Sequence, residues 1–201
     1  MPDEQNDANA SDPTVDPARA LDAIVAEVSA AAGSLAQGGS EQLEQVARLL
    51  SGAERVFVHG AGRSGLALRM TAMRLMHLGL RVHVVGDVTT PAIAPGDVLL
   101  TASGSGTTGG IVRAAQSAVD AGAQVAALTT AADSPLAGLA SAVILVPAAD
   151  KLDRSGTASA QYSGGLFEQV VVLAGDALFH ALWKRRGESA DELWPRHANL
   201  E

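Results

Sequence analysis

The stretch Ser103-Gly-Ser-Gly-Thr107 stands between a short apolar run, Asp97 to Ala102, and an alanine-rich segment, Ile111 to Gly122. This order predicts a strand, a tight turn and a helix. Glycines let main-chain N–H groups converge on an anion, hydroxyls add donors, and a helix N-terminus adds partial positive charge. The stretch therefore indicates a pocket for the phosphate of a small ligand, although an ordinary strand-to-helix turn has a similar composition. The turn contains no lysine, so it is not a nucleotide-binding P-loop.

The composition limits the class of protein. A chain of 201 residues is long enough for one α/β domain with a helical appendage. Its formal net charge of -8 disfavours nucleic acid and anionic membranes as partners. The sequence has no cysteine, which excludes disulfides and thiolate catalysis, and no spacing of His, Asp and Glu suggests a metal site. The N-terminus lacks the basic and apolar regions of a signal peptide, and no run of about 18 apolar residues predicts a membrane span. We expect a cytoplasmic protein without a cofactor.

The chain divides into three predicted parts. Residues 1–12 are acidic and polar and are expected to form a disordered tail. Residues 13–52 are expected to form two helices, the first begun by Asp16-Pro17 and the second capped by Ser40. These helices are expected to cover a sheet edge or an oligomer partner. Residues 53–201 are expected to form the main domain with a C-terminal tail.

Five short apolar runs predict strands at residues 55–59, 82–85, 97–102, 124–129 and 142–146. They alternate with helical segments, which predicts a parallel sheet buried on both faces. A short helix is expected after Ser134-Pro135, a long apolar helix at 166–184, and a short capped helix at 189–193. Ligands bind at the carboxyl ends of strands in such sheets. The turns at 59–65 and 103–107 follow strands, and the long loop at 150–165 follows the fifth strand, so all three are expected at one rim.

A dinucleotide-binding fold is the rival interpretation. Gly60, Gly62 and Gly65 form a GxGxxG pattern after a strand, and Asp87 stands where a ribose-binding acid would lie. Two helices precede this pattern, whereas the fingerprint normally begins the chain. A second glycine-hydroxyl turn also closes the third strand, and one pyrophosphate does not need two such turns.

Several segments together resemble the 6-phospho-3-hexuloisomerase family, within the sugar isomerase (SIS) fold. They are HGAGRSG at 59–65, AMRLMHLGL at 72–80, VVGDVTTP at 84–91, SGSGT at 103–107, LFEQ at 166–169 and RHANLE at 196–201. The resemblance covers residues 21–201. It implies a five-stranded parallel sheet of flavodoxin-like order between helices. It also implies conversion of D-arabino-3-hexulose 6-phosphate to fructose 6-phosphate in the ribulose monophosphate route, for formaldehyde assimilation or pentose phosphate supply. The family is usually tetrameric, with the C-terminal tail contributing to a neighbour's site.

The resemblance also implies roles for individual residues. The substrate and its phosphate would be bound by Gly62, Arg63 and Ser64 in the first turn and by Ser103, Ser105, Thr107 and Thr108 around the second. The catalytic residues would be Glu168 and His197. This chain departs from the family pattern where Thr107 replaces a frequent Glu, where the segment before Leu166 lacks a Pro, and where His59 replaces a small residue.

The chemistry requires one proton to move from C2 to C3 through a cis-enediol. One carboxylate on one face can carry that proton, and Glu168 is the candidate; a surface glutamate is the plainer alternative. His197 titrates in the range needed for proton movement between O2 and O3, provided that the tail docks, and a neighbouring subunit can supply it. Arg63 is expected at the substrate, with an interface ion pair as the alternative. Two other functions stay open: a non-catalytic sugar-phosphate-binding regulator, and another aldose–ketose phosphate isomerase.

Overall fold

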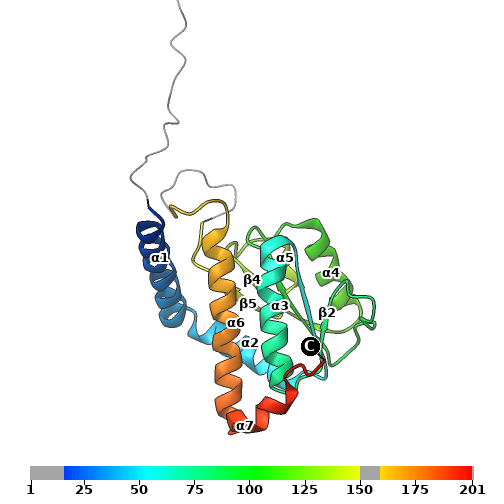
Figure 1. Cartoon of the computed structure of the whole chain (residues 1–201). Coiled ribbons are helices and arrows are strands. Elements are labelled where there is room, and N and C mark those ends of the chain that lie inside the picture. The colour runs from blue at the N-terminus through cyan, green and yellow to red at the C-terminus, as the bar shows by residue number, and fades with distance from the viewer. Residues whose placement is uncertain (1–15, 150–158, 201) are drawn as a thin grey trace, which may run out of the picture.

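The computed structural model describes residues 16–149 and 159–200, so the predicted tail at 1–12 and most of the predicted loop at 150–165 lie outside the described residues. Five strands form one parallel sheet in the order β2-β1-β3-β4-β5 (Figure 1). The strands are β1 (Val56–Gly60), β2 (Val82–Val84), β3 (Val98–Ala102), β4 (Gln124–Thr129) and β5 (Ala142–Leu145). The flavodoxin-like order confirms the predicted fold class, and each strand lies within two residues of its predicted position.

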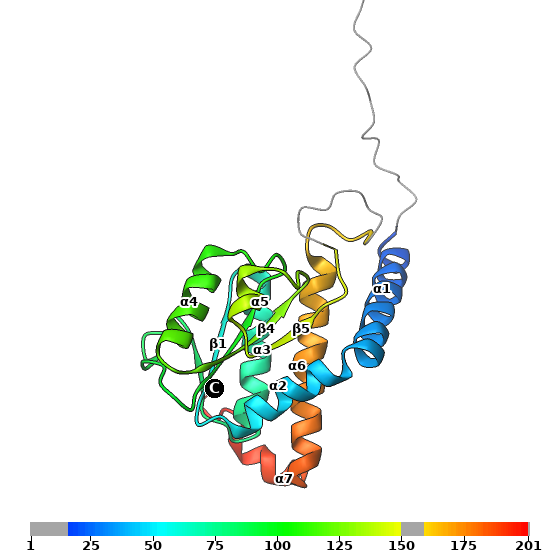
Figure 2. The ribbon, with the colours of Figure 1, turned by 180° about the vertical axis from the view of Figure 1, so that it is seen from behind.

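Helices cover both faces of the sheet. They are α1 (Pro17–Gly38), α2 (Ser40–Gly52), α3 (Gly62–His77), α4 (Gly109–Asp120), α5 (Pro135–Leu139), α6 (Gly165–Arg186) and α7 (Ala190–Leu193), followed by the 3-10 helix η1 (Trp194–Arg196). Figure 1 shows α3 and α6 in front of the sheet, and Figure 2 shows α4 and α5 on its other face. A hydrophobic core lies on each face of the sheet, and successive residues of a strand point alternately into one core and the other. Val58 and Leu100 pack on the side of α3 and α6, whereas Phe57 packs on the side of α4.

The two N-terminal helices differ in how they pack. Helix α2 packs against β5 and α6, and its Val46 and Leu50 are fully buried. Helix α1 lies beside α6 and away from the sheet in both views (Figures 1 and 2). Within α1 only Ala31 and Leu35 are buried. One side of α1 therefore stays available at the surface.

Local capping follows the sequence with one exception. Asp16 accepts a hydrogen bond from the Arg19 N–H at 2.8 Å, which begins α1 as predicted. Ser134 caps α5, and Ser189 forms a capping box with Glu192, again as predicted. The predicted cap at Ser40 is wrong, because Gly39 is the N-cap of α2 and Ser40 is already its first helical residue.

Helix α6 is the central helix of its face. By length and composition alone it could cross a membrane. Eight of its residues are buried, and seven of them, among them Val170, Val171 and Leu178, join the core shared with α2, α3 and the sheet. The apolar residues of α6 are thus used in packing within the domain. Helices α3 and α6 lie side by side with both N-termini at the same end (Figure 1).

Candidate active site

A cavity of about 200 Å³ lies at the carboxyl end of the sheet, where β1 and β3 run side by side and Gly60 pairs with Ala102. Its lining comes from residues 61–64 after β1, from the last residue of β3 and the turn after it (residues 102–105 and Thr108), and from Ala149, Gly164, Phe167 and Glu168. The strand order changes direction between β1 and β3, and ligands bind at such switch points in parallel sheets. The two glycine turns therefore meet in one pocket, together with the beginning of α6.

Three helix N-termini converge on this cavity. The N-cap residues of α3, α4 and α6 are Ala61, Thr108 and Gly164; all three line the cavity, and none makes a side-chain capping bond. The first N–H groups of a helix lack partners within the helix, and the helix dipole adds partial positive charge at that end. The pocket is therefore built to attract an anion, even though the chain as a whole is acidic.

The turn after β3 adds donors to this site. The N–H groups of Gly104, Ser105 and Thr108 make no hydrogen bond to any of the described residues. The hydroxyls of Ser103 and Thr108 lie 2.9 Å apart and bond to each other. All of these residues line the pocket. Such a ring of main-chain N–H groups and hydroxyls can hold a phosphate without a lysine.

The predicted binding residues are placed there with one exception. Gly62, Arg63, Ser64, Ser103, Ser105 and Thr108 line the cavity, whereas Thr107 does not. Thr107 is exposed and its hydroxyl donates to Ser105 Oγ at 2.9 Å. Thr107 thus reaches the pocket only through Ser105.

Glu168 enters the pocket from the first turn of α6, and its N–H donates to the Gly164 carbonyl. Its carboxylate accepts a hydrogen bond from Arg63 Nε and forms an ion pair with that guanidinium. The Glu168 side chain is 17% exposed, whereas that of Arg63 is 69% exposed. A largely enclosed carboxylate with an exposed cation beside it can exchange a proton with a bound sugar while the cation faces developing negative charge.

The glycines of the first turn have a packing role. A Cβ at Gly65 would lie 2.3 Å from the Gly60 carbonyl oxygen, so the start of α3 touches the end of β1. Asp87 forms an ion pair with Arg69 at 3.0 Å. Close packing explains the glycines of the GxGxxG pattern, and the ion pair with Arg69 explains Asp87. Neither feature requires a bound dinucleotide.

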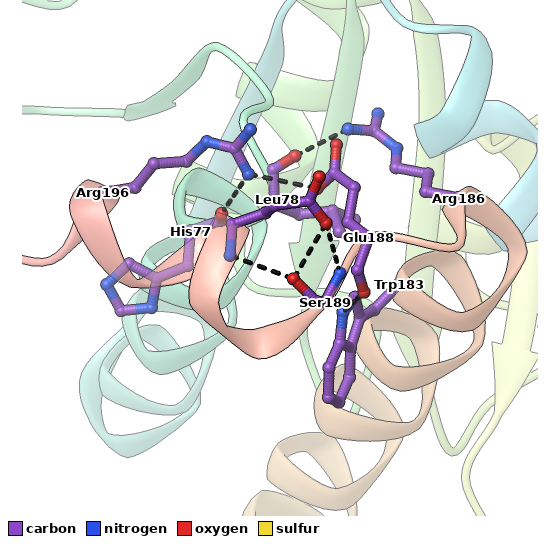
Figure 3. Close-up of polar contacts among 8 residues, drawn as sticks. His77, Leu78, Trp183, Arg186, Glu188, Ser189 and Arg196 are labelled. Atoms are coloured by element: carbon purple, nitrogen blue, oxygen red, sulfur yellow. Dashed lines mark hydrogen bonds and ion pairs between the residues drawn. The ribbon is translucent and has the colours of Figure 1, made fainter.

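The C-terminal tail docks against the far end of α3. Arg196 donates to the His77 carbonyl at 3.0 Å and pairs with Glu188 at 3.2 Å (Figure 3). The ring of His197 stacks on that of His77, with 4.0 Å between ring centroids. Burial, more than the neighbouring His197 and Arg74, lowers the pKa of His77. These contacts hold residues 194–197 at the carboxyl end of α3.

Within one subunit the structure therefore does not bring His197 to Glu168. Arg63, the partner of Glu168, is the second residue of α3, and His77, the partner of His197, is its last. Fourteen residues of α-helix separate them, which corresponds to roughly 21 Å. Only a second subunit could present His197 to this pocket without rearranging the tail.

His59 is a residue whose position sequence reasoning did not explain. It follows the three buried residues of β1 and is itself half-buried, and its ring bonds to the main chain of Gly110, in the first turn of α4. Burial lowers the pKa of His59 and outweighs this hydrogen bond, which acts in the opposite direction. His59 thus ties the first strand to the helix that carries the phosphate turn. No local pattern signals it, because the partner is distant in sequence.

Within residues 16–149 and 159–200, no group of three or more His, Asp or Glu side chains is placed to hold a metal ion. The groups in this pocket that can bind an anion or move a proton are Arg63, Glu168 and the main-chain donors.

Comparison with known proteins gives a consistent result. The SIS domain family matches residues 49–164. The 3-hexulose-6-phosphate isomerase of Mycobacterium gastri is 58% identical over 170 residues, which are 85% of each chain. A Methanococcus jannaschii crystal structure, from which a 3-hexulose-6-phosphate isomerase function was inferred, has a TM-score of 0.76 and 26% identity, and the match covers 90% of this chain and 99% of that one. The Vibrio vulnificus NanR protein, complexed with ManNAc-6P, has a TM-score of 0.70 over 92% of this chain and 72% of that one; at 22% identity this likeness shows the fold alone.

Proposed function

The chain belongs to the SIS domain family, and from that premise we propose that its pocket interconverts D-arabino-3-hexulose 6-phosphate and fructose 6-phosphate. The observation that carries this function is the meeting of three uncapped helix N-termini and the Glu168 carboxylate in one cavity. The N-termini suit a phosphate, and the carboxylate suits proton transfer between carbons. The same pocket thus combines what a sugar phosphate isomerase needs.

The phosphate is proposed to lie in the turn after β3. Its oxygens would accept hydrogen bonds from the N–H groups of Gly104 and Ser105 and from the hydroxyls of Ser103 and Thr108. These two hydroxyls bond to each other, so both already lie together within the turn. The sugar would then extend toward Arg63 and Glu168 on the opposite wall.

Glu168 is proposed to carry the proton between carbons. Its carboxylate takes the C2 proton of the hexulose, the C2–H electron pair forms the C2–C3 double bond, and the C3 carbonyl becomes an enediolate oxygen. Glu168 then returns the proton to C3 as the C2 carbonyl forms. Arg63, which pairs with Glu168, is proposed to face the negative charge that develops on the oxygen. The balance also requires one proton to pass from O2 to O3, and His197 of a second subunit is proposed for that transfer.

A homo-oligomer, a tetramer or a dimer, is proposed because apolar side chains remain exposed on adjoining helices. Leu66, Met70 and Met73 are each more than half exposed and follow one another at helical spacing on α3. Between α1 and α6 lies a groove of about 430 Å³ with almost wholly apolar walls, at which the buried Gln169 Oε1 has no partner among the described residues. A second copy would cover these apolar surfaces. Light scattering should then give a multiple of 20.4 kDa, and M70E/M73E should reduce it.

We also propose a cytoplasmic location and a place in the ribulose monophosphate pathway. The proposed substrate and product are both phosphorylated sugars of central metabolism. Fructose 6-phosphate is the product when formaldehyde is assimilated and the substrate when pentose phosphate is supplied.

The test is hydrogen exchange with the pure protein in D₂O. Interconversion of two ketoses removes the hydrogen at C3 of fructose 6-phosphate, whereas an aldose–ketose isomerase removes one at C1. We expect exchange at C3 by NMR, and formaldehyde release when a hexulose-phosphate aldolase is added. Exchange at C1 would instead indicate another isomerase, and binding without exchange would indicate a regulator.

A further inference from the structure

Glu27, on helix α1, holds the segment that leads into α6. Its carboxylate accepts hydrogen bonds from Ser159 Oγ at 2.7 Å, from the Ala160 N–H at 2.7 Å and from Gln161 Nε2 at 3.1 Å. More than 130 residues separate Glu27 from these partners. In both views the chain before α6 runs toward α1 (Figures 1 and 2). One side chain thus organises three consecutive residues.

These three residues stand directly before the pocket wall. The Ser159 hydroxyl also accepts the Gln161 N–H at 3.0 Å, so the segment is closed on itself as well as on Glu27. Two residues later the backbone enters the left-handed region, at Ser163 with φ 31° and at Gly164 with φ 84°. A non-glycine residue there is uncommon and is maintained by its surroundings. Gly164 lines the pocket and its carbonyl accepts the Glu168 N–H.

The carboxylate is suited to this task because it only accepts hydrogen bonds. The hydrogen bond from Ser159, followed by that from Ala160, lowers the pKa of Glu27 despite partial burial, so the group is ionised at neutral pH. In the described part of the chain, every hydrogen bond from residues 159–161 to another helix ends on Glu27. Helices α1 and α6 also pack directly on each other, and the groove between them is lined by apolar side chains such as Val28 and Val172. Apolar contacts are non-directional, so they do not set the orientation of the turn.

We propose that Glu27 is a positioning residue for the isomerisation: by fixing residues 159–161 it sets the turn at 163–164, and thereby the place of the Glu168 carboxylate opposite Arg63. This inference rests on the proposed function, because it assigns Glu27 a role through Glu168. Helix α1 would then contribute to the reaction although none of its residues lines the pocket. A displacement of about 1 Å in a catalytic group can cost a hundredfold in rate.

The experiment measures kcat and KM for fructose 6-phosphate, and the melting temperature, for E27A, E27Q and the control D22N. Asp22 is exposed on the same helix, so D22N removes one charge without touching the segment. We expect kcat to fall about tenfold to a hundredfold in E27A with KM within about twofold, because the phosphate turn is unchanged. E27Q keeps an acceptor for the Ala160 N–H and should recover part of kcat, and D22N should match the wild type. A merely structural role would lower the melting temperature and leave kcat per folded protein unchanged, which would overturn the proposal.

A second variant keeps the test decisive if E27A folds poorly. S159A removes the hydroxyl that donates to Glu27, and its kcat should fall as that of E27A does. The effects of E27A and S159A should be non-additive in the double variant, because both act through one contact. Additive effects, or wild-type kcat in S159A, would contradict the inference. The proposed function is judged separately by the wild-type protein: an inactive wild type rejects the function, whereas an active wild type with an equally active E27A rejects only the role of Glu27.

Discussion

Arg63 and Glu168 form an ion pair across the pocket, although 105 residues separate them in the sequence. Each belongs to the first turn of a helix, α3 for Arg63 and α6 for Glu168. Because α3 and α6 pack side by side with their N-termini at the same end, the charges meet where the sheet ends. The pair connects the proposed substrate-binding cation to the proposed proton carrier.

Removing Arg63 tests the first half of this pair. In R63A we expect KM for fructose 6-phosphate to rise about tenfold or more, since a hydrogen bond to a charged group contributes about 1.5–3 kcal/mol. The kcat should fall as well, because Glu168 loses the group that orients it. R63K keeps the charge without the planar fork and should recover only part of the loss. Unchanged kinetics in R63A would show that Arg63 has no part in binding.

Glu168 itself is tested by an isosteric change. In E168Q we expect kcat to fall about 10²–10⁴-fold, the range of a general acid–base group, with fructose 6-phosphate still bound. Loss of C3 hydrogen exchange, followed by NMR, should parallel the loss of kcat. Titration calorimetry supplies the binding control. An E168Q variant that exchanges hydrogen at the wild-type rate would remove Glu168 from the mechanism.

The source of His197 can be found by mixing two inactive variants. Within one subunit, His197 lies with His77 at the other end of α3 from the pocket. If a neighbour supplies His197, a mixed oligomer of E168Q and H197A contains sites that join an intact Glu168 to an intact His197. We expect activity to appear after the two variants are denatured and refolded together, and not after refolding each alone. Mixed oligomers that stay inactive would contradict a shared site.

Gly106 is expected to be essential for the shape of the phosphate turn. Its φ is 63°, and a Cβ there would lie 2.0 Å from Ser134 Oγ. G106A should lower the free energy of unfolding by about 1–3 kcal/mol, measured by urea denaturation, and raise KM. Gly110 in the first turn of α4 is the matched control, since nothing lies within 4 Å of its added Cβ. G110A should therefore keep wild-type stability, and equal losses in both variants would show that the turn imposes no special constraint.

Asp97 should make the stability depend on acid pH. Burial alone would raise its pKa, but hydrogen bonds from Arg55 and the Ala94 N–H, with the charges of Arg55 and His83, lower it below the usual 3.8. A lowered folded-state pKa gives stability that is full above the unfolded value and is lost as pH falls through the folded value. We expect the melting temperature of the wild type to decline below about pH 4, more steeply than that of D97N.

At neutral pH, D97N should melt lower than the wild type, by about 2–4 °C for each kcal/mol lost in a domain of this size. R55K is the accompanying variant, because it keeps a charge beside the 1% exposed Asp97 side chain but not the pair of hydrogen bonds from the guanidinium. Equal acid slopes in wild type and D97N would show that another carboxylate controls the transition.

The fold could be predicted to a large extent because its signals are local. The five strands are short apolar runs, and their alternation with helical segments determines that the sheet is parallel. Caps such as Asp16 and Ser189 act on N–H groups three residues away and are visible in the sequence. The predicted cap at Ser40 failed because Gly39 alone joins α1 and α2 and takes the cap position itself, where a Cβ would lie 2.6 Å from Leu35 Cδ1.

The sequence alone determined which turns carry glycines and hydroxyls, that both follow strands, and that Glu168 begins a helix. The tertiary structure decided which of these groups meet. The Arg63–Glu168 pair, the bond from His59 to Gly110, the contacts of Glu27 with residues 159–161 and the docking of His197 on His77 all join distant parts of the chain. Such contacts follow from how helices pack on a sheet. Hydrophobic periodicity predicts local helices and strands, but it does not indicate which residue far along the chain a side chain will contact.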